Sequence, residues 1–224
     1  MFKKRAVGLS TLAVVLLGVY IRFIRPWQLR WGATDEEVAQ SMPGDDIVQY
    51  PTFCATRAVT IQTRSEEIWP WLVQIGCTRA GMYSHDWLDN AGIPSAQRII
   101  PEFQHLAAGD FIPLTPNGKQ GMWVKGFDPN HWMLWVAKED KATWFWGLYP
   151  QNEGHTRLIT RLRVQYVWTL PWVLYYLLQE VGDIVMMRKC MLGIKQRTER
   201  SDGQMHERIE ASIHLQVRQD EPLA

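Results

Sequence analysis

The chain has 224 residues, enough for one domain of ordinary size and a flanking element. Twenty-four Lys and Arg against 23 Asp and Glu give a formal net charge of +1, which excludes the strongly basic surface typical of nucleic-acid-binding proteins. Hydrophobic residues make up 46% of the chain and supply a core, and the twelve tryptophans can fill that core, line a cavity or lie at a membrane interface.

The N-terminal segment has a basic start at residues 3–5, followed by an uncharged apolar stretch. That stretch is shorter than the ~20 residues that a perpendicular helix needs to cross a bilayer, but a snorkelling Arg22 extends it. Bulky and charged residues follow where a signal peptide needs small residues for cleavage. We therefore predict that residues 6–24 cross a membrane as an uncleaved single-pass anchor, within a segment of residues 1–30. Basic residues on both sides leave its orientation open.

Residues 31–50 read as a connector between this anchor and a folded domain of residues 51–200. Thr34 and Glu37 have the spacing of a capping box, which predicts a short helix, and the following "MPGDD" ends it.

The folded domain opens with a predicted strand at residues 53–63, whose odd positions from Phe53 to Ile61 are apolar apart from Arg57. A charge at such a position lies either at a wet strand end or in an ion pair inside a cavity. We predict that Arg57 points inward and meets a carboxylate, with Asp86 or Asp110 as the expected partner. A helix at residues 65–76 follows, ended by a glycine.

A long irregular segment, residues 77–114, comes next and contains a short helix after Ser84 and a strand near its end. Loops of this length inside a compact domain usually serve a function. Four strands are then predicted from their alternation and from the polar turns between them, at residues 121–128, 131–138, 142–150 and 155–166. The third of these is bulky on both faces, so its periodicity does not tell which face is inside.

The last predicted strand carries Arg157, Arg161 and Arg163 on its outer face, which indicates a solvated sheet surface or contact with lipid headgroups. Beyond it, apolar residues recur at spacings of three and four and predict a long helix over residues 171–197. The polar tail, residues 201–224, is expected to be disordered.

Strand, helix, long insert, antiparallel strands and long C-terminal helix together predict an α+β fold of the helix-grip type, in which a curved antiparallel sheet wraps around the C-terminal helix. The segments "WGATDEEVAQSMPGDD", "ATRAVTIQTRSEEIWPWLVQIG", "RAGMYSHDWLDN" and "MMRKCMLGIKQR" resemble membrane-anchored bacterial members of the START-like, Bet v 1-like superfamily (SRPBCC), which is related to polyketide cyclases. The resemblance implies a hydrophobic cavity between sheet and helix, and a lipid or other hydrophobic small molecule as its ligand. It does not imply a reaction.

The loop "QIGCTRAGMYSHDW", residues 74–87, is expected to border the entrance of that cavity. It is a structural loop, a rim that gates the ligand, or the site of a catalytic pair formed by His85 and Asp86. We hypothesise that it controls access to the cavity rather than performing chemistry, with Tyr83 and Trp87 on one face of a short helix. The candidate ligand-contacting residues are Arg57, Trp71, Tyr83, His85, Asp86, Trp87, Trp144 and Trp146.

Three function classes follow: a membrane-tethered binding module for a hydrophobic molecule, a cyclase or aromatase-like enzyme that uses His85 and Asp86 for proton transfer, or an interaction domain with a filled core. The sequence has no nucleophile motif, and its cysteines and histidines lack metal-ligand spacing, so we predict no catalytic residue, metal or cofactor. An open cavity with His85 outside it would favour binding, whereas His85 inside would favour chemistry.

Overall fold

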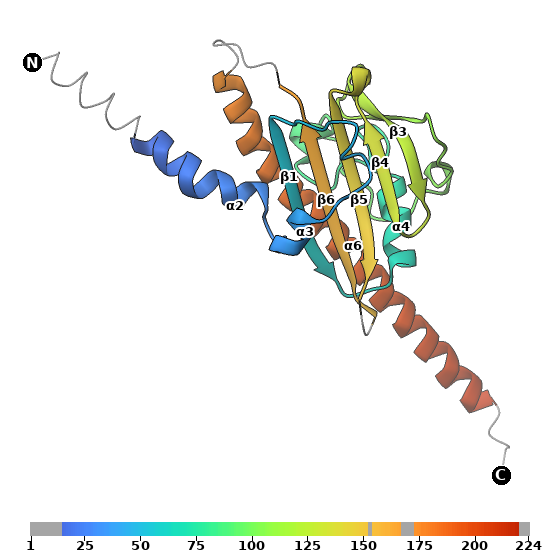
Figure 1. Ribbon diagram of the computed structural model, residues 1–224. Helices are drawn as coiled ribbons and strands as arrows, with labels where there is room; N and C mark the ends of the chain where they lie inside the picture. The colour runs from blue at the N-terminus through green and yellow to red at the C-terminus, as the bar shows by residue number, and fades with distance from the viewer. Residues whose placement is uncertain (1–14, 152–153, 167–172, 220–224) are drawn as a thin grey trace, which may run out of the picture.

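A computed structural model describes residues 15–151, 154–166 and 173–219, without the side chains of residues 173, 174, 177 and 204–219 (Figure 1). It has an α+β fold built on a six-stranded antiparallel sheet with the strand order β1-β6-β5-β4-β3-β2. The strands are β1 (Phe53–Ile61), β2 (Phe111–Pro113), β3 (Gly121–Asp128), β4 (Trp132–Val136), β5 (Ala142–Pro150) and β6 (Thr156–Val164).

The sheet brings the first and last strands together, with Phe53 opposite Val164 and Ile61 opposite Thr156. The other strands follow one another as a meander, because polar turns join them. The predicted strands at 121–128 and 142–150 match β3 and β5. The prediction at 131–138 was too long, since Lys138–Asp140 forms a 3₁₀ turn, η3.

The helices within the domain include α4 (Ser65–Val73), α5 (Asp86–Asp89), η2 (Pro101–Phe103) and the long α6 (Val173–Gln219). Helix α6 crosses one face of the sheet and packs against β1 and α4 (Figure 1). Its buried stripe includes Ile184, Met187, Met191 and Ile194, which recur at helical spacing. This is the predicted helix-grip arrangement.

Helix α6 extends well beyond its predicted end at residue 197. It continues to Gln219 and projects from the sheet, where the sequence predicted a disordered tail over residues 201–224 (Figure 1). Residues 198–219 are rich in Glu, Gln, Arg and other good helix formers, and a helix can propagate from a packed segment without a new nucleus. Residues 220–224 lie outside the described part of the chain.

Both faces of the sheet are covered, which explains why β5 is bulky on both sides. The face beneath α6 holds the main core, including Trp135, Trp144 and Trp146. On the opposite face, the connector lies across the strands and closes a second core of Met42, Ala58, Leu134, Phe145 and Ile159. The connector contains the predicted helix, α3 (Asp35–Ala39), and its capping box between Thr34 and Glu37 is present.

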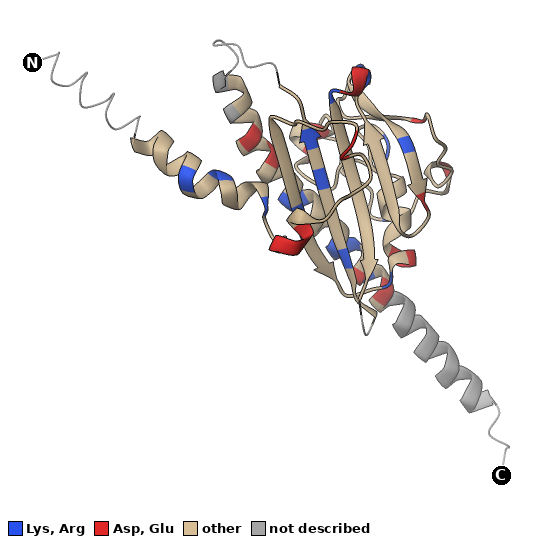
Figure 2. Ribbon diagram, in the orientation of Figure 1, with Lys and Arg blue, Asp and Glu red and all other residues tan. Residues whose placement is uncertain are grey.

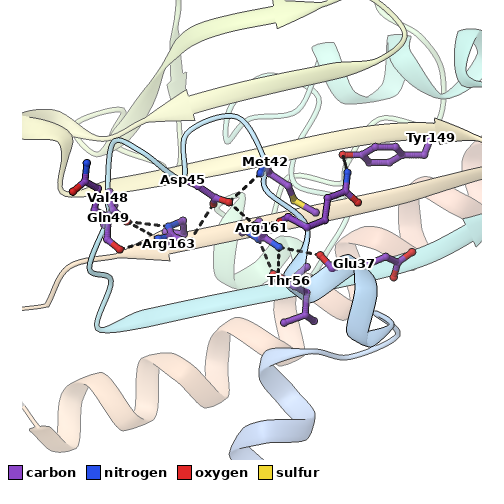
Figure 3. A network of polar contacts seen from close by, with 11 residues as sticks. Glu37, Met42, Asp45, Val48, Gln49, Thr56, Tyr149, Arg161 and Arg163 are labelled. Carbon is purple, nitrogen blue, oxygen red and sulfur yellow. Dashed lines mark hydrogen bonds and ion pairs between the residues drawn. The ribbon is translucent and has the colours of Figure 1, made fainter.

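The outer face of β6 is not the solvated surface that the sequence indicated. Arg161 is buried and donates to the carbonyl oxygens of Glu37, Val38 and Gln40 in the connector, and it forms an ion pair with Asp45 at 2.7 Å (Figure 3). The neighbouring arginines bind the same segment: Arg157 pairs with Glu37, and Arg163 donates to Val48 O. Figure 2 shows basic positions spread along β6 and the acidic helix α3 near one end of that strand.

The N-terminal segment is helical from residue 15 onward, through the π-helix η1 (Tyr20–Ile24) and into α2 (Arg25–Leu29). It is attached to the domain through an ion pair between Arg25 and Glu180 at 2.7 Å. In the described part of the chain, none of the helices has both the length and the apolar character needed to cross a bilayer, so the predicted transmembrane helix is not found there. Residues 6–14 of the predicted span lie outside the described residues.

Candidate ligand-binding cavity

A cavity of about 540 Å³ lies between α6, the sheet and the loop that leads into α5. Its walls are largely apolar. The lining residues are Met82, Ser84, Asp89, Trp144, Tyr175, Leu178, Gln179, Gly182, Asp183, Met186, Met187 and Cys190. The eight residues from α6 recur at spacings of three and four and therefore form one face of that helix.

Gly182 contributes open space to this wall. A Cβ atom built on Gly182 would meet no atom within 4 Å, so a side chain there would extend into unoccupied volume without a backbone clash. The absence of a side chain at this position leaves room in the cavity.

The polar group that the sequence interpretation missed is Asp89. Its side chain is buried, with 4% exposed, and neither carboxylate oxygen has a hydrogen-bond partner among the described residues. Burial, followed by the charge of Asp86, raises the pKa of Asp89. The nearby Ser84 hydroxyl lowers the pKa of Asp89. The hydrogen of that hydroxyl is donated to Met186 O at 3.0 Å, so it does not satisfy the carboxylate. An unsatisfied buried carboxyl group is costly, and a group of this kind in a cavity wall is a candidate functional residue.

Arg57 and Asp183 form an ion pair beside this cavity. Arg57 is 1% exposed, its Nη2 atom lies 2.7 Å from Asp183 Oδ2, and its Nε atom donates to Gln28 O at 2.9 Å. The predictions that Arg57 points inward and meets a carboxylate are confirmed, but the partner comes from α6 and is neither Asp86 nor Asp110. Burial raises the pKa of Asp183, and the charge of Arg57 acts against that rise.

Trp144 lies in the cavity wall, whereas two other predicted contact residues lie deeper in the core. The indole N–H of Trp144 donates to Thr160, and its ring stacks on Trp146 at 5.1 Å between centroids. Trp146 is completely buried, and Trp71 packs edge-on against Tyr83. Neither Trp71 nor Trp146 lines the cavity.

Tyr83, His85 and Asp86 line a second hollow, of about 850 Å³, which extends along the outer side of α6. His85 Nδ1 lies 3.3 Å from Lys189 Nζ, and Asp86 accepts a hydrogen bond from Ser95. Tyr83 is itself buried, and its hydroxyl donates to the carbonyl of Trp71. The structure therefore places His85 outside the cavity under α6.

The expected pairing of Tyr83 and Trp87 on one helical face is absent. Helix α5 begins only at Asp86, and Tyr83 has a positive φ of 54°, so the two residues do not share a helix. Trp87 is 73% exposed and lines neither hollow. Asp86 and Asp89 lie on the same short helix but line different hollows. The sequence motif alone did not show which aspartate lines which hollow.

The wall also contains the thiol of Cys190, which is buried. Burial raises the pKa of this thiol, so it is protonated at neutral pH and is a poor nucleophile. Among the described residues, no three His, Cys, Asp or Glu side chains lie close enough together to hold a metal ion.

Fold and cavity together define an α+β protein of the helix-grip type with an apolar cavity beside α6. Neither a known protein family nor a curated protein matches the sequence. Solved structures that resemble it include a START superfamily protein from Mycobacterium smegmatis, with 12% identity, 66% of this chain and 97% of that chain covered, and a TM-score of 0.41. A Polyketide_cyc-like protein from Corynebacterium glutamicum has 15% identity, coverages of 76% and 97%, and a TM-score of 0.32. An AHSA1-like protein from Aeromonas hydrophila has 12% identity, coverages of 66% and 94%, and a TM-score of 0.36. Identities and scores this low carry no argument about activity, so function is argued from the cavity.

Proposed function

We propose that this protein binds a hydrophobic small molecule in the cavity under α6. The observation that carries the proposal is the cavity itself, whose volume of about 540 Å³ falls in the range of small-molecule sites and whose walls are mainly apolar. The tryptophans of the sheet pack beside this space without filling it. The open space argues against an interaction domain with a filled core.

The positions of the candidate catalytic groups favour binding over a cyclase-like reaction. His85 and Asp86 line the outer hollow and do not face the cavity. The cavity wall, as described, pairs neither Cys190 nor Asp89 with a histidine that could act as a base.

We further propose that the protein is tethered to a membrane through residues 6–24. Support comes from the exposed apolar side chains along residues 15–27, which have no protein partner to cover them in the described part of the chain: Val15, Leu16, Leu17, Val19, Ile21, Phe23, Ile24 and Trp27. Carbonate extraction of membranes tests the tether. The full-length chain should stay in the pellet, and a mature chain that begins near Trp31 in the soluble fraction would refute it.

The binding proposal is tested with the full-length chain by native mass spectrometry and with the neutral fluorescent probe N-phenyl-1-naphthylamine. We expect a retained apolar molecule, or saturable probe binding, in the unmodified protein. Gly182→Leu should abolish probe binding because its side chain fills the cavity without a clash. Gly203→Leu is the matched control, since Gly203 lies on the same helix with equally open surroundings but away from the cavity. Equal probe binding by both variants would contradict the proposed site.

A further inference from the structure

The hydrogen-bond donors of the cavity wall are mostly engaged within the protein, whereas some of its acceptors are not. Three side chains of the wall already donate within the protein: Ser84 donates to Met186 O, Gln179 donates to Tyr175, and the indole of Trp144 donates to Thr160. The guanidinium of Arg57 is occupied by Asp183 and Gln28 O. The cavity therefore offers an incoming head group little hydrogen-bond donation from these residues.

The acceptors of the same wall are not all used, because both oxygens of Asp89 lack a partner. Asp183 adds a second carboxylate to the wall, although Arg57 neutralises it. An anionic head group placed in this cavity would meet carboxylates and no unpaired cation among the lining residues. A cationic head group would instead complete the unsatisfied carboxylate.

We infer that the cavity selects apolar amines, with the ammonium head bound by the carboxylate of Asp89 and the apolar body lying against Met82, Trp144 and Met187. The inference rests on the proposed binding function and adds the chemical class of the ligand to it. Asp89 is suited to this role because it is buried, unpartnered and part of the wall. Asp86, three residues earlier, is bonded to Ser95 and faces the outer hollow.

The experiment compares three probes that share a twelve-carbon chain: dodecylammonium, dodecanol and dodecanoate. Each probe is used to displace N-phenyl-1-naphthylamine from the full-length protein in the same non-ionic detergent. Partitioning of a probe into micelles is then equal for all variants and cancels when the variants are compared. For the unmodified protein we expect dodecylammonium to displace the dye at a concentration at least about tenfold lower than dodecanoate does.

Asp89→Asn keeps the size of the side chain and removes its charge. We expect this variant to bring the ammonium and carboxylate probes within about threefold of each other, while displacement by dodecanol changes little. Asp86→Asn is the control and should retain the preference of the unmodified protein. Asp89→Ala provides a second variant, and thermal unfolding followed by circular dichroism checks that each variant is folded.

The two proposals fail in different ways. If the dye and all three probes fail to bind, the binding function itself is wrong. If dodecanol displaces the dye but dodecylammonium is no better than dodecanoate, or if the preference persists in both Asp89 variants, then binding stands and the inference about amines is overturned.

Discussion

Replacing Arg161 with lysine is expected to loosen the connector from the sheet, because a single ammonium group cannot reproduce what the guanidinium does. Arg161 donates to Thr56 and to three connector carbonyl groups, at 2.8 to 2.9 Å, and pairs with Asp45 at 2.7 Å. A lysine at this position keeps the charge but has three donors at one point instead of five in a fork.

The expected loss follows from the bonds that lysine leaves unmade. At least two of the five contacts are lost, and a hydrogen bond to a charged donor contributes about 1.5–3 kcal/mol. Because the bonds to Val38 O and Gln40 O are only part-buried, water can replace the missing donor, and we expect a smaller decrease of about 2–4 kcal/mol in the free energy of unfolding. For a chain of this size the melting temperature should fall by about 4–16 °C.

Urea unfolding followed by tryptophan fluorescence measures this loss, since Trp132 borders the second core beneath the connector. Arg98→Lys is the control, because Arg98 is exposed, and its free energy of unfolding should change by less than about 0.5 kcal/mol. If Arg161→Lys unfolds at the same urea concentration as Arg98→Lys, the connector is not held by Arg161 and the reasoning is refuted.

Three further predictions concern the cavity. Arg57→Met should lower the free energy of unfolding by about 3 kcal/mol because it leaves the partly buried Asp183 unpaired, and adding Asp183→Asn should restore part of this loss. A double-mutant cycle in urea without coupling would contradict the ion pair. Burial raises the pKa of Asp89 in the folded state, so between the ordinary aspartate pKa of about 4 and this raised pKa the folded state holds more protons than the unfolded one, and stability falls as pH rises through that window. Asp89→Asn should remove this slope, and parallel pH curves for the two proteins would argue against it. Cys190, fully buried with a raised thiol pKa, should resist iodoacetamide at pH 8 until urea unfolds the chain, as followed by mass spectrometry; rapid labelling of the folded protein would show that the cavity is open to solvent at that point.

The sheet was predictable because alternation and polar turns are local signals. The ranges of β3 and β5 followed from their residues alone, and the long insert and last helix then left few arrangements that bury every apolar face. The C-terminal end of α6 was harder to predict from the sequence, because a polar helix that continues from a packed one has no apolar periodicity to mark it.

The outer face of β6 could not be predicted from local sequence patterns alone. A period of two places Arg157, Arg161 and Arg163 on one face, but it does not show what covers that face. The connector covers it mainly with backbone carbonyl groups, which leave no hydrophobic signature in the sequence. The same limit applies to Asp89, since only the folded loop shows which aspartate of "SHDWLDN" faces the cavity.

The attachment of the N-terminal helix determines how the molecule would respond to tension. A force pulling on residue 15 would first load the pair of Arg25 with Glu180 on α6 and the contact between Gln28 O and Arg57 in the middle of β1. The force would therefore enter the sheet at Arg57, which pairs with Thr160 of β6, and not at Phe53, the first residue of β1. The guanidinium that carries part of this load also holds Asp183 in the cavity wall, and Glu180 lies on the helix that supplies most of that wall. A displacement of the N-terminal helix would therefore be transmitted to the lining of the cavity through Arg57 and through Glu180.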